Sequence, residues 1–274
     1  MKRVIGIFGV PRSGTSWLGQ IFNSSPETRF AYQPMFAEAF RDQIHARSTA
    51  EEMRGYLKKI YDSQQDFLTQ EDGKAKSRRL VFNKNSDSPE VFVFKEVMYL
   101  YMIPRFLRNL PEMKVILLLR NPYDVLKSWY NAPKEFYPEW DIEEEWRFAQ
   151  SKNWFLPERY YGFHRWQESI VLASQLEREF PDRVYILKYE DLDEAPIEYA
   201  MKIFDFCELA WQEQTNDFIT QSRNETESDP YSVFRNPVDR KKSMAELPEN
   251  IKMMIQQEMN LFSEAESWYQ GDYN

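Results

Sequence analysis

The stretch RVIGIFGVPRSGTSWLGQIF, residues Arg3–Phe22, decides the fold of this chain. Its first part, residues 4–10, is a short apolar run that ends in Gly-x-Pro, a pattern typical of a buried strand followed by a turn. Its last part, residues 15–23, repeats apolar side chains at helical spacing. The stretch therefore predicts a strand, a glycine loop and a helix in direct succession.

The glycine loop, GVPRSGTS at residues 9–16, has the spacing of a phosphate-binding P-loop, but Thr15 stands at the position of the P-loop lysine. In such a loop, backbone N–H groups and the positive end of the helix dipole converge on one point and favour a phosphate there. Ser13, Thr15 and Ser16 add hydroxyl donors, and Arg12 supplies a cation near the place of the missing lysine. The loop by itself also fits a helix that merely packs against a strand.

A second basic site follows the clearest buried strand of the chain, MKVILLLR at residues 113–120. Arg120 leaves the C-terminal end of that strand, where open α/β sheets bind ligands. Asn121 is a good N-cap and Pro122 a good first residue for the next helix, and Ser128 lies two turns into that helix on the side that faces back. Arg120 and Ser128 together can hold a second phosphate, although a surface arginine and a solvated serine are the alternative.

Apolar strands alternate with helical patterns along the rest of the chain. Further strands are expected at residues 29–34, 91–97 and 183–189. Helical segments are expected at residues 36–68, 99–109, 159–180, 197–207 and 248–262. This order predicts an α/β fold: one domain over residues 1–274, with a central, mostly parallel sheet flanked by helices on both faces.

Composition limits the class of ligand and the location. The formal net charge of −9 argues against general nucleic-acid binding, so an anionic ligand needs a local basic site. No apolar run approaches the ~18 residues of a membrane span. Gly6 and Gly9 interrupt the apolar stretch near the start, so we expect a cytoplasmic protein without a membrane span. The single cysteine, Cys207, lies in an apolar pattern that favours a buried thiol.

The two basic sites, in this order and on successive strand-to-helix turns, resemble the PAPS-dependent sulfotransferases, which have a P-loop-like fold. In that family the first loop, here PRSGTSWL at residues 11–18, holds the 5′-phosphosulfate of the donor. An Arg-x7-Ser motif, here RNPYDVLKS at residues 120–128, holds its 3′-phosphate. The resemblance continues in ILKYEDLDEAP at residues 186–196 and in DRKKSMAELPENI at residues 239–251. It therefore spans nearly the whole chain.

The resemblance implies a donor site for PAPS, with PAP as the product and no requirement for a metal. Trp17 would stack on the adenine, Tyr189 would contact the same base, and Arg240 and Lys241 would close on the 3′-phosphate. The alternatives are that Trp17 anchors its helix in the core and that Arg240 and Lys241 are solvated charges. The residues expected to bind the donor are Arg12, Ser13, Gly14, Thr15, Ser16, Trp17, Arg120, Ser128, Tyr189, Arg240 and Lys241.

Sulfuryl transfer needs cations on the bridging oxygen and the departing phosphate, and a base for the acceptor proton. Arg12 and Lys95 are the candidate cations, because Lys95 ends the strand at residues 91–95 and matches a lysine found there in many members of the family. The familiar bases are absent. Members that act on small phenols and alcohols carry Lys-Thr-His where this chain has Lys95-Glu96-Val97.

Carbohydrate-acting members often carry Tyr-Glu-Pro after the second strand, whereas this chain has Tyr-Gln-Pro at residues 32–34, and an amide cannot accept a proton as a carboxylate does. The nearest carboxylates, Glu96 and Glu38, are therefore the candidate bases, with Glu96 preferred. His45 and His164 are the remaining alternatives.

The acceptor remains open between a saccharide, a lipid-like alcohol, an aromatic metabolite and a peptide tyrosine. The segment at residues 129–166 holds thirteen aromatic side chains, which can wall an acceptor pocket or pack in a core. Two other functions stay possible: a nucleotide kinase, which Thr15 and the Arg120–Ser128 pair disfavour, and a PAP-binding protein without catalysis.

Overall fold

The structure is a computed structural model that describes the chain except for residues 71–79, 237–243, 267 and 270–274. Its centre is one five-stranded sheet in the order β2-β3-β1-β4-β5, in which every neighbouring pair is parallel. The strands are β1 (Arg3–Phe8), β2 (Thr28–Tyr32), β3 (Val91–Glu96), β4 (Met113–Leu119) and β5 (Val184–Lys188). The single α/β domain with a parallel sheet is thus confirmed.

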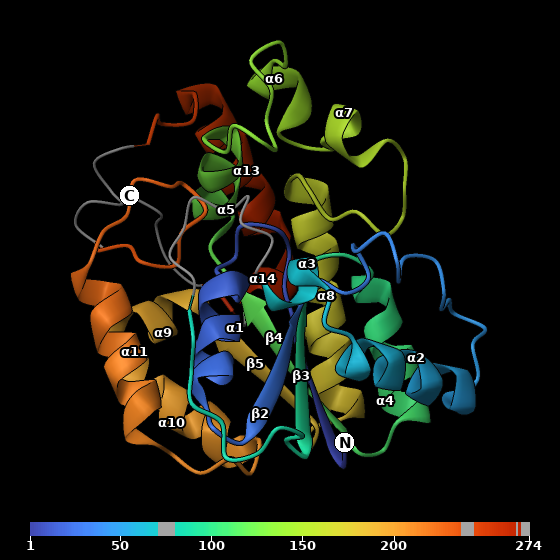
Figure 1. Ribbon diagram of the computed structural model, residues 1–274. Helices are drawn as coiled ribbons and strands as arrows, with labels where there is room; N and C mark the ends of the chain where they lie inside the picture. The colour runs from blue at the N-terminus through green and yellow to red at the C-terminus, as the bar shows by residue number, and fades with distance from the viewer. Residues whose placement is uncertain (71–79, 237–243, 267, 270–274) are drawn as a thin grey trace.

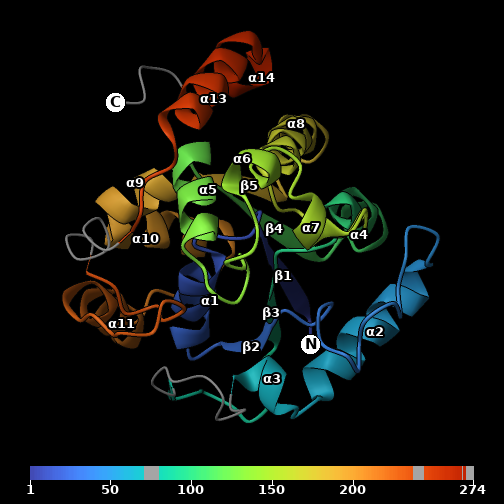
Figure 2. The same ribbon diagram turned by 90° about the horizontal axis from the view of Figure 1, so that it is seen from above.

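Helices cover both faces of the sheet because the central strands are apolar on both sides, as buried parallel strands are. Within β1, Ile5 and Ile7 pack into one hydrophobic cluster, whereas Val4 and Phe8 pack into the other. The first cluster is covered by α1 (Thr15–Ser24), α10 (Pro196–Phe206) and α11 (Glu213–Asn224). The second is covered mainly by α2 (Ala50–Asp62), α4 (Ile103–Asn109), α5 (Pro122–Tyr130), α8 (Phe163–Glu179) and α13 (Glu249–Leu261). Figures 1 and 2 show α1, α10 and α11 on one side of the strands and α2, α4 and α8 on the other.

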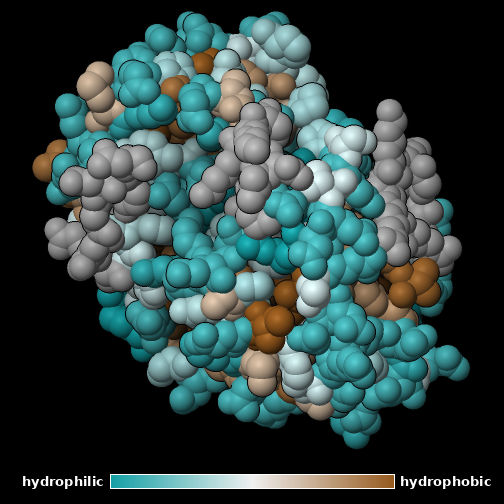
Figure 3. Space-filling view, turned by 90° about the vertical axis from the view of Figure 1, so that its left-hand side faces the viewer, coloured by the Kyte–Doolittle hydropathy of each residue, from teal (hydrophilic) through white to brown (hydrophobic). Residues whose placement is uncertain are grey.

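The remaining elements are short. They are α3 (Asp66–Thr69), the 3₁₀ helix η1 (Leu100–Met102), α6 (Ile142–Glu145), α7 (Gln150–Asn153), α9 (Tyr189–Glu194) and α14 (Ser263–Glu266). Among the described residues, no helix combines the length and apolar character needed to cross a membrane. The face presented in Figure 3 is mostly hydrophilic, with hydrophobic side chains in small separate groups.

The expected helix at residues 36–68 is wrong over its first third. Residues 34–48 form turns and irregular backbone, in which Asp42 has a left-handed φ of 60°. The helix begins only after Thr49, whose side chain accepts from the Glu52 N–H while the Glu52 side chain accepts from the Thr49 N–H. This capping box satisfies two of the helix's unpaired N–H groups and sets its start. Helix α11 was not expected, because its segment is strongly polar and buries few side chains.

The expectation for Cys207 is confirmed. The thiol is buried at the end of α10, and burial raises its pKa well above the ordinary value. A thiol held in its protonated form in the core has a structural role and little nucleophilic character.

Candidate functional site

A cleft lies at the carboxyl ends of the five strands, the edge at which parallel α/β sheets bind their ligands. Tyr32 ends β2, Lys95 lies near the end of β3, Arg120 follows β4 and Tyr189 follows β5, while the glycine loop connects β1 to α1. All of these contribute to the lining. The described lining residues are Pro11, Arg12, Gly14, Thr15, Ser16, Trp17, Tyr32, Gln33, Lys95, Val97, Arg120, Ser128, Glu135, Tyr161, Tyr189, Ser222, Arg223, Pro230, Tyr231, Ser232, Val233, Arg235 and Met244.

The glycine loop is held in a backbone shape that leaves the start of α1 open. Gly14 has a φ of 94°, and a Cβ there would lie 2.5 Å from the ring of Tyr189, so glycine is required on both counts. No side chain caps α1, and its first turn carries no acidic residue. The N–H groups at this helix start therefore face a position suited to an anion.

Two further features of the loop suggest a bound group. Arg12 adopts a left-handed φ of 73°. This conformation is rare and costly for a residue with a side chain, and such strained residues cluster at functional sites. Ser13 is fully buried, and its Oγ has no hydrogen-bond partner among the described residues. A buried hydroxyl without a partner costs free energy unless a ligand or water completes it.

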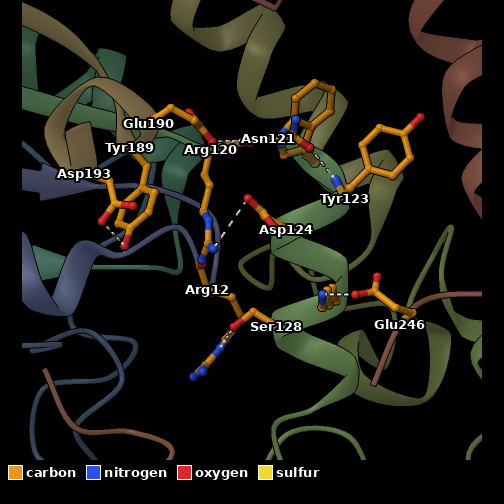
Figure 4. A network of polar contacts seen from close by, with 12 residues as sticks. Arg12, Arg120, Asn121, Tyr123, Asp124, Ser128, Tyr189, Glu190, Asp193 and Glu246 are labelled. Atoms are coloured by element: carbon orange, nitrogen blue, oxygen red, sulfur yellow. Dashed lines mark hydrogen bonds and ion pairs between the residues drawn. The ribbon is translucent and has the colours of Figure 1, made fainter. Parts of the chain in front are cut away.

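The two basic sites form one connected cluster. Arg12 Nε donates to Ser128 Oγ at 3.1 Å, and Arg120 Nη1 donates to the carbonyl oxygen of Arg12 at 2.9 Å. Figure 4 shows Arg120 between the ring of Tyr189 and helix α5, where Asp124 Oδ2 lies 3.8 Å from Arg120 Nη2. Two arginines on adjacent loops thus line one cleft, and they supply local positive charge in an acidic protein.

The position of α5 follows from its N-terminal sequence, as expected. Asn121 is the N-cap, its side chain accepts from the Tyr123 N–H at 2.9 Å, and Pro122 is the first helical residue. Glu190 Oε1 also accepts from the Asn121 N–H at 2.8 Å, and Trp166 Nε1 donates to the Arg120 carbonyl at 2.8 Å. These contacts fix the turn that presents Arg120, and α5 then carries Ser128 to the cleft.

Aromatic rings and a second charged pair form one side wall. The rings of Trp17 and Tyr189 pack edge to face with centroids 6.3 Å apart, and both residues also belong to the core cluster under α1. Trp17 Nε1 donates to Ser222 Oγ at 2.9 Å, and the guanidinium of Arg223, paired with Asp193, lies 5.5 Å from the Trp17 ring. Trp17 is therefore both a core anchor and a wall of the cleft.

Lys95 carries its ammonium group into the cleft although the side chain is only 2% exposed. Its Nζ lies 4.5 Å from the ring centre of Tyr32. Burial lowers the pKa of Lys95 to about 8, although the charges of Glu96 and Glu135 act in the opposite direction. The charged form of Lys95 is therefore poorly stabilised in the free protein. An anionic ligand beside it would stabilise that charge.

The geometry does not support Glu96 as the base. Its Oε2 accepts from the Met35 N–H at 3.0 Å, and its Oε1 accepts from the N–H groups of Val97 and Met98 at 2.9 and 3.3 Å. Burial raises the pKa of Glu96 to about 7, but the side chain does not line the cleft. Neighbouring residues of a strand point to opposite faces, so Lys95 in the cleft directs Glu96 away from it.

The other candidates for the base also lie outside the cleft lining. Glu38 is exposed in a turn, because residues 36–48 are not helical. His164 is half exposed on α8 with its Nδ1 3.3 Å from Glu168, and His45 is exposed, accepting at Nδ1 from the Arg47 N–H. Arg240 and Lys241, expected at the 3′-phosphate, lie outside the described residues.

Sequence reasoning missed a carboxylate that does line the cleft, Glu135. Its Oε1 lies 4.0 Å from Arg12 Nη1, and its Oε2 is buried without a hydrogen-bond partner among the described residues. Burial raises the pKa of Tyr161, and the charge of Glu135 and a side-chain hydrogen bond with Glu135 raise it further. Glu135 lies in the aromatic segment at residues 129–166, so this segment was the one available signal.

That aromatic segment mostly builds the core. Trp129, Trp146 and Trp166 are buried in the hydrophobic cluster beneath α5 and α8, whereas Trp154 is exposed. Of its thirteen aromatic residues, Tyr161 alone is among the described residues that line the cleft. The core alternative thus accounts for most of the segment.

Comparisons with known proteins agree with this fold. Residues 5–213, more than half of the chain, match the model of the Sulfotransferase family. The chain belongs to this family.

Solved structures show the same fold at low identity. A sulfotransferase from Alicyclobacillus acidocaldarius matches with a TM-score of 0.53 and 14% identity, over 97% of this chain and 95% of that one. A mouse sulfotransferase in complex with PAP matches with a TM-score of 0.55 and 13% identity, over 98% of this chain and 90% of that one. The sulfotransferase domain from the curacin biosynthetic pathway matches with a TM-score of 0.53 and 17% identity, over 96% and 98% of the two chains.

A curated relative extends beyond this chain. An uncharacterized protein of Aquifex aeolicus is 24% identical over 226 residues, which are 81% of this chain. The match spans only 28% of that relative's length.

Proposed function

We propose that this protein transfers a sulfuryl group from PAPS to a hydroxyl or amine of an acceptor and releases PAP. The observation that carries the proposal is the hydrogen-bonded cluster in which Arg12 of the glycine loop contacts both Ser128 and Arg120. It joins a phosphate loop without a lysine to an Arg-x7-Ser pair at one cleft. The family and the solved complex of a neighbour with PAP support the same donor.

The proposed donor site divides by the chemistry of its residues. The start of α1, with Gly14, Thr15 and Ser16, holds the 5′-phosphosulfate, because unpaired N–H and hydroxyl donors meet there. Arg120 and Ser128 bind the 3′-phosphate through charge-assisted hydrogen bonds, with Arg240 and Lys241 as further ligands. Ser13 supports the loop, while Trp17 and Tyr189 contact the adenine.

Lys95 and Arg12 supply positive charge where the departing phosphate gains negative charge. The S–O bond to the 5′-phosphate breaks during transfer, and its electron pair stays with PAP. A cation in a poorly solvated cleft stabilises that developing charge more than it would in water. The proposal assigns this role to the protein's own cations and needs no metal.

The acceptor is proposed to be a small molecule or a saccharide. Tyr32, Tyr161 and Tyr231 line the cleft on the side of Lys95 and Glu135, and such rings pack well against sugar faces or apolar ring systems. We further propose a cytoplasmic location, because a buried single thiol needs no oxidising compartment.

Calorimetric titration tests the donor and separates the alternatives. Micromolar binding of PAP without magnesium, with much weaker binding of ATP, is expected of a sulfotransferase; the reverse preference would instead favour a nucleotide kinase. Transfer of labelled sulfate from PAPS to any member of an acceptor screen then excludes a protein that only binds PAP.

A further inference from the structure

The geometry points to Glu135 as the group that removes the acceptor proton, an inference that rests on the proposed function. The usual carboxylate position after β2 is occupied here by Gln33, which lies in the same cleft. In this chain Glu135, in the segment that follows α5, takes the place of that carboxylate. Glu135 Oε1 lies 4.0 Å from Arg12 Nη1, and the charge of Glu135 acts to raise the pKa of Lys95.

The main chain at Glu135 is anchored, so its carboxylate is positioned in advance. The Glu135 N–H donates to the Ala132 carbonyl at 2.8 Å, which closes a turn after α5. The Glu135 carbonyl accepts from Trp129 Nε1 at 3.0 Å, and Trp129 is fully buried. The Lys134 N–H donates to the Tyr231 hydroxyl at 2.9 Å, which ties the same turn to another residue of the cleft lining. A base held this way needs little reorganisation during reaction.

The carboxylate itself is placed for proton transfer. One oxygen, Oε1, faces the guanidinium of Arg12 at 4.0 Å, and the other, Oε2, is buried without a hydrogen-bond partner among the described residues. Because Glu135 lines the cleft beside the phosphate loop, its carboxylate can accept a hydrogen bond from an acceptor hydroxyl. Glu96, in contrast, uses both of its oxygens on backbone N–H groups.

The step balances with the groups present and PAPS. The acceptor oxygen forms a bond to sulfur while the bond from sulfur to the 5′-phosphate oxygen breaks and its electron pair leaves with PAP. The proton of the acceptor hydroxyl passes to Glu135 and is later lost to solvent. The products are the sulfate ester, PAP and this proton.

The test compares wild-type protein with Glu135→Gln and with the matched control Glu139→Gln, an exposed carboxylate four residues away. PAP release from PAPS is followed with water, phenol and para-nitrophenol as acceptors. Glu135→Gln should lower the rate with phenol by ~10²–10⁴-fold, the usual contribution of a general base. The loss with para-nitrophenol should be far smaller, because that phenol is already largely ionised near neutral pH. Glu139→Gln should match the wild type.

PAP affinity supplies a second readout, which reports whether Glu135 lies beside the donor phosphates. Removing a negative charge beside a phosphate site should tighten PAP binding to Glu135→Gln by about twofold, the scale of a partly solvated charge pair. Wild-type turnover in Glu135→Gln, or equal losses with both phenols, would overturn this inference alone. Wild-type protein that fails to bind PAP, or that binds it and transfers no sulfate from PAPS to any member of the acceptor screen, would overturn the proposed function as well.

Discussion

Arg120 is 8% exposed, yet it lines the cleft. Nη1 of Arg120 donates to the Arg12 carbonyl, whereas Nε of Arg120 is buried without a hydrogen-bond partner among the described residues. Its guanidinium also lies 4.5 Å from the ring centre of Tyr189. A buried charged donor of this kind is costly unless a ligand completes its hydrogen bonds, which a 3′-phosphate would do.

Replacing Arg120 by Ala should therefore weaken PAP binding by roughly 1.5–3 kcal/mol, the worth of hydrogen bonds to charged groups. Adenosine 5′-phosphosulfate lacks the 3′-phosphate, so its affinity should change far less. Calorimetry with both ligands measures the difference. Equal losses would mean that Arg120 acts through the Arg12 carbonyl and does not contact the 3′-phosphate.

The lowered pKa of Lys95 predicts how activity depends on pH. Burial lowers its pKa to about 8, so in the free protein the ammonium is present below that pH and is lost as pH rises through it. If the cation assists transfer, kcat/KM for PAPS should fall above about pH 8, because kcat/KM reports the free enzyme. Lys95→Arg keeps the charge at every accessible pH and should remove this fall. A wild-type profile that stays level to pH 10 would exclude the role.

At the scale of elements, the end of β3 is tied to the turn after β2. Gln33, the first residue of that turn, donates its N–H to the Lys95 carbonyl at 2.8 Å, and Glu96 receives three backbone N–H groups from residues 35, 97 and 98. One carboxylate thus closes two loops and leaves Lys95 pointing into the cleft. From this arrangement we expect Glu96 to stabilise the fold.

Glu96→Gln should lower the free energy of unfolding, because the new amide group cannot accept all three N–H groups. Each buried N–H left without a partner costs about 1–3 kcal/mol. Urea denaturation measures the loss, and the exposed control Glu38→Gln should stay within about 0.5 kcal/mol of wild type. A Glu96→Gln protein with full stability and no turnover would instead restore Glu96 as the base.

At the scale of the whole molecule, ligands at the cleft should stabilise the entire domain. The cleft is built from the ends of all five strands, so PAP would bind the folded chain and not the unfolded one. At 100 times its Kd, PAP without magnesium should add about 2.7 kcal/mol to the free energy of unfolding. For a domain of this size that is a rise in Tm of about 5–10 °C, measurable by differential scanning fluorimetry. Glu139→Gln should show the full rise; a similar rise with ATP but none with PAP would contradict the assigned donor.

Local patterns in the sequence determined the sheet, the glycine loop and the capped turn at Arg120. Each depends on residues close together in the chain: an apolar run ending at a glycine for β1, and Asn121-Pro122 for the start of α5. The parallel order followed from strands alternating with helices. The helix expected from residue 36 begins only after Thr49. Its start is set by the capping box of Thr49 and Glu52, in which each side chain accepts from a backbone N–H group.

Tertiary structure alone decided which carboxylate enters the cleft. An apolar strand buried on both faces, such as VFVFKE in β3, gives no sign of which face turns toward the ligand, so Lys95 and Glu96 could not be assigned to opposite sides beforehand. Glu135 approaches Arg12 only because α5 and the turn after it fold back over the loop between β1 and α1. Contacts between segments so distant in the chain arise from packing, and no spacing in the sequence encodes them.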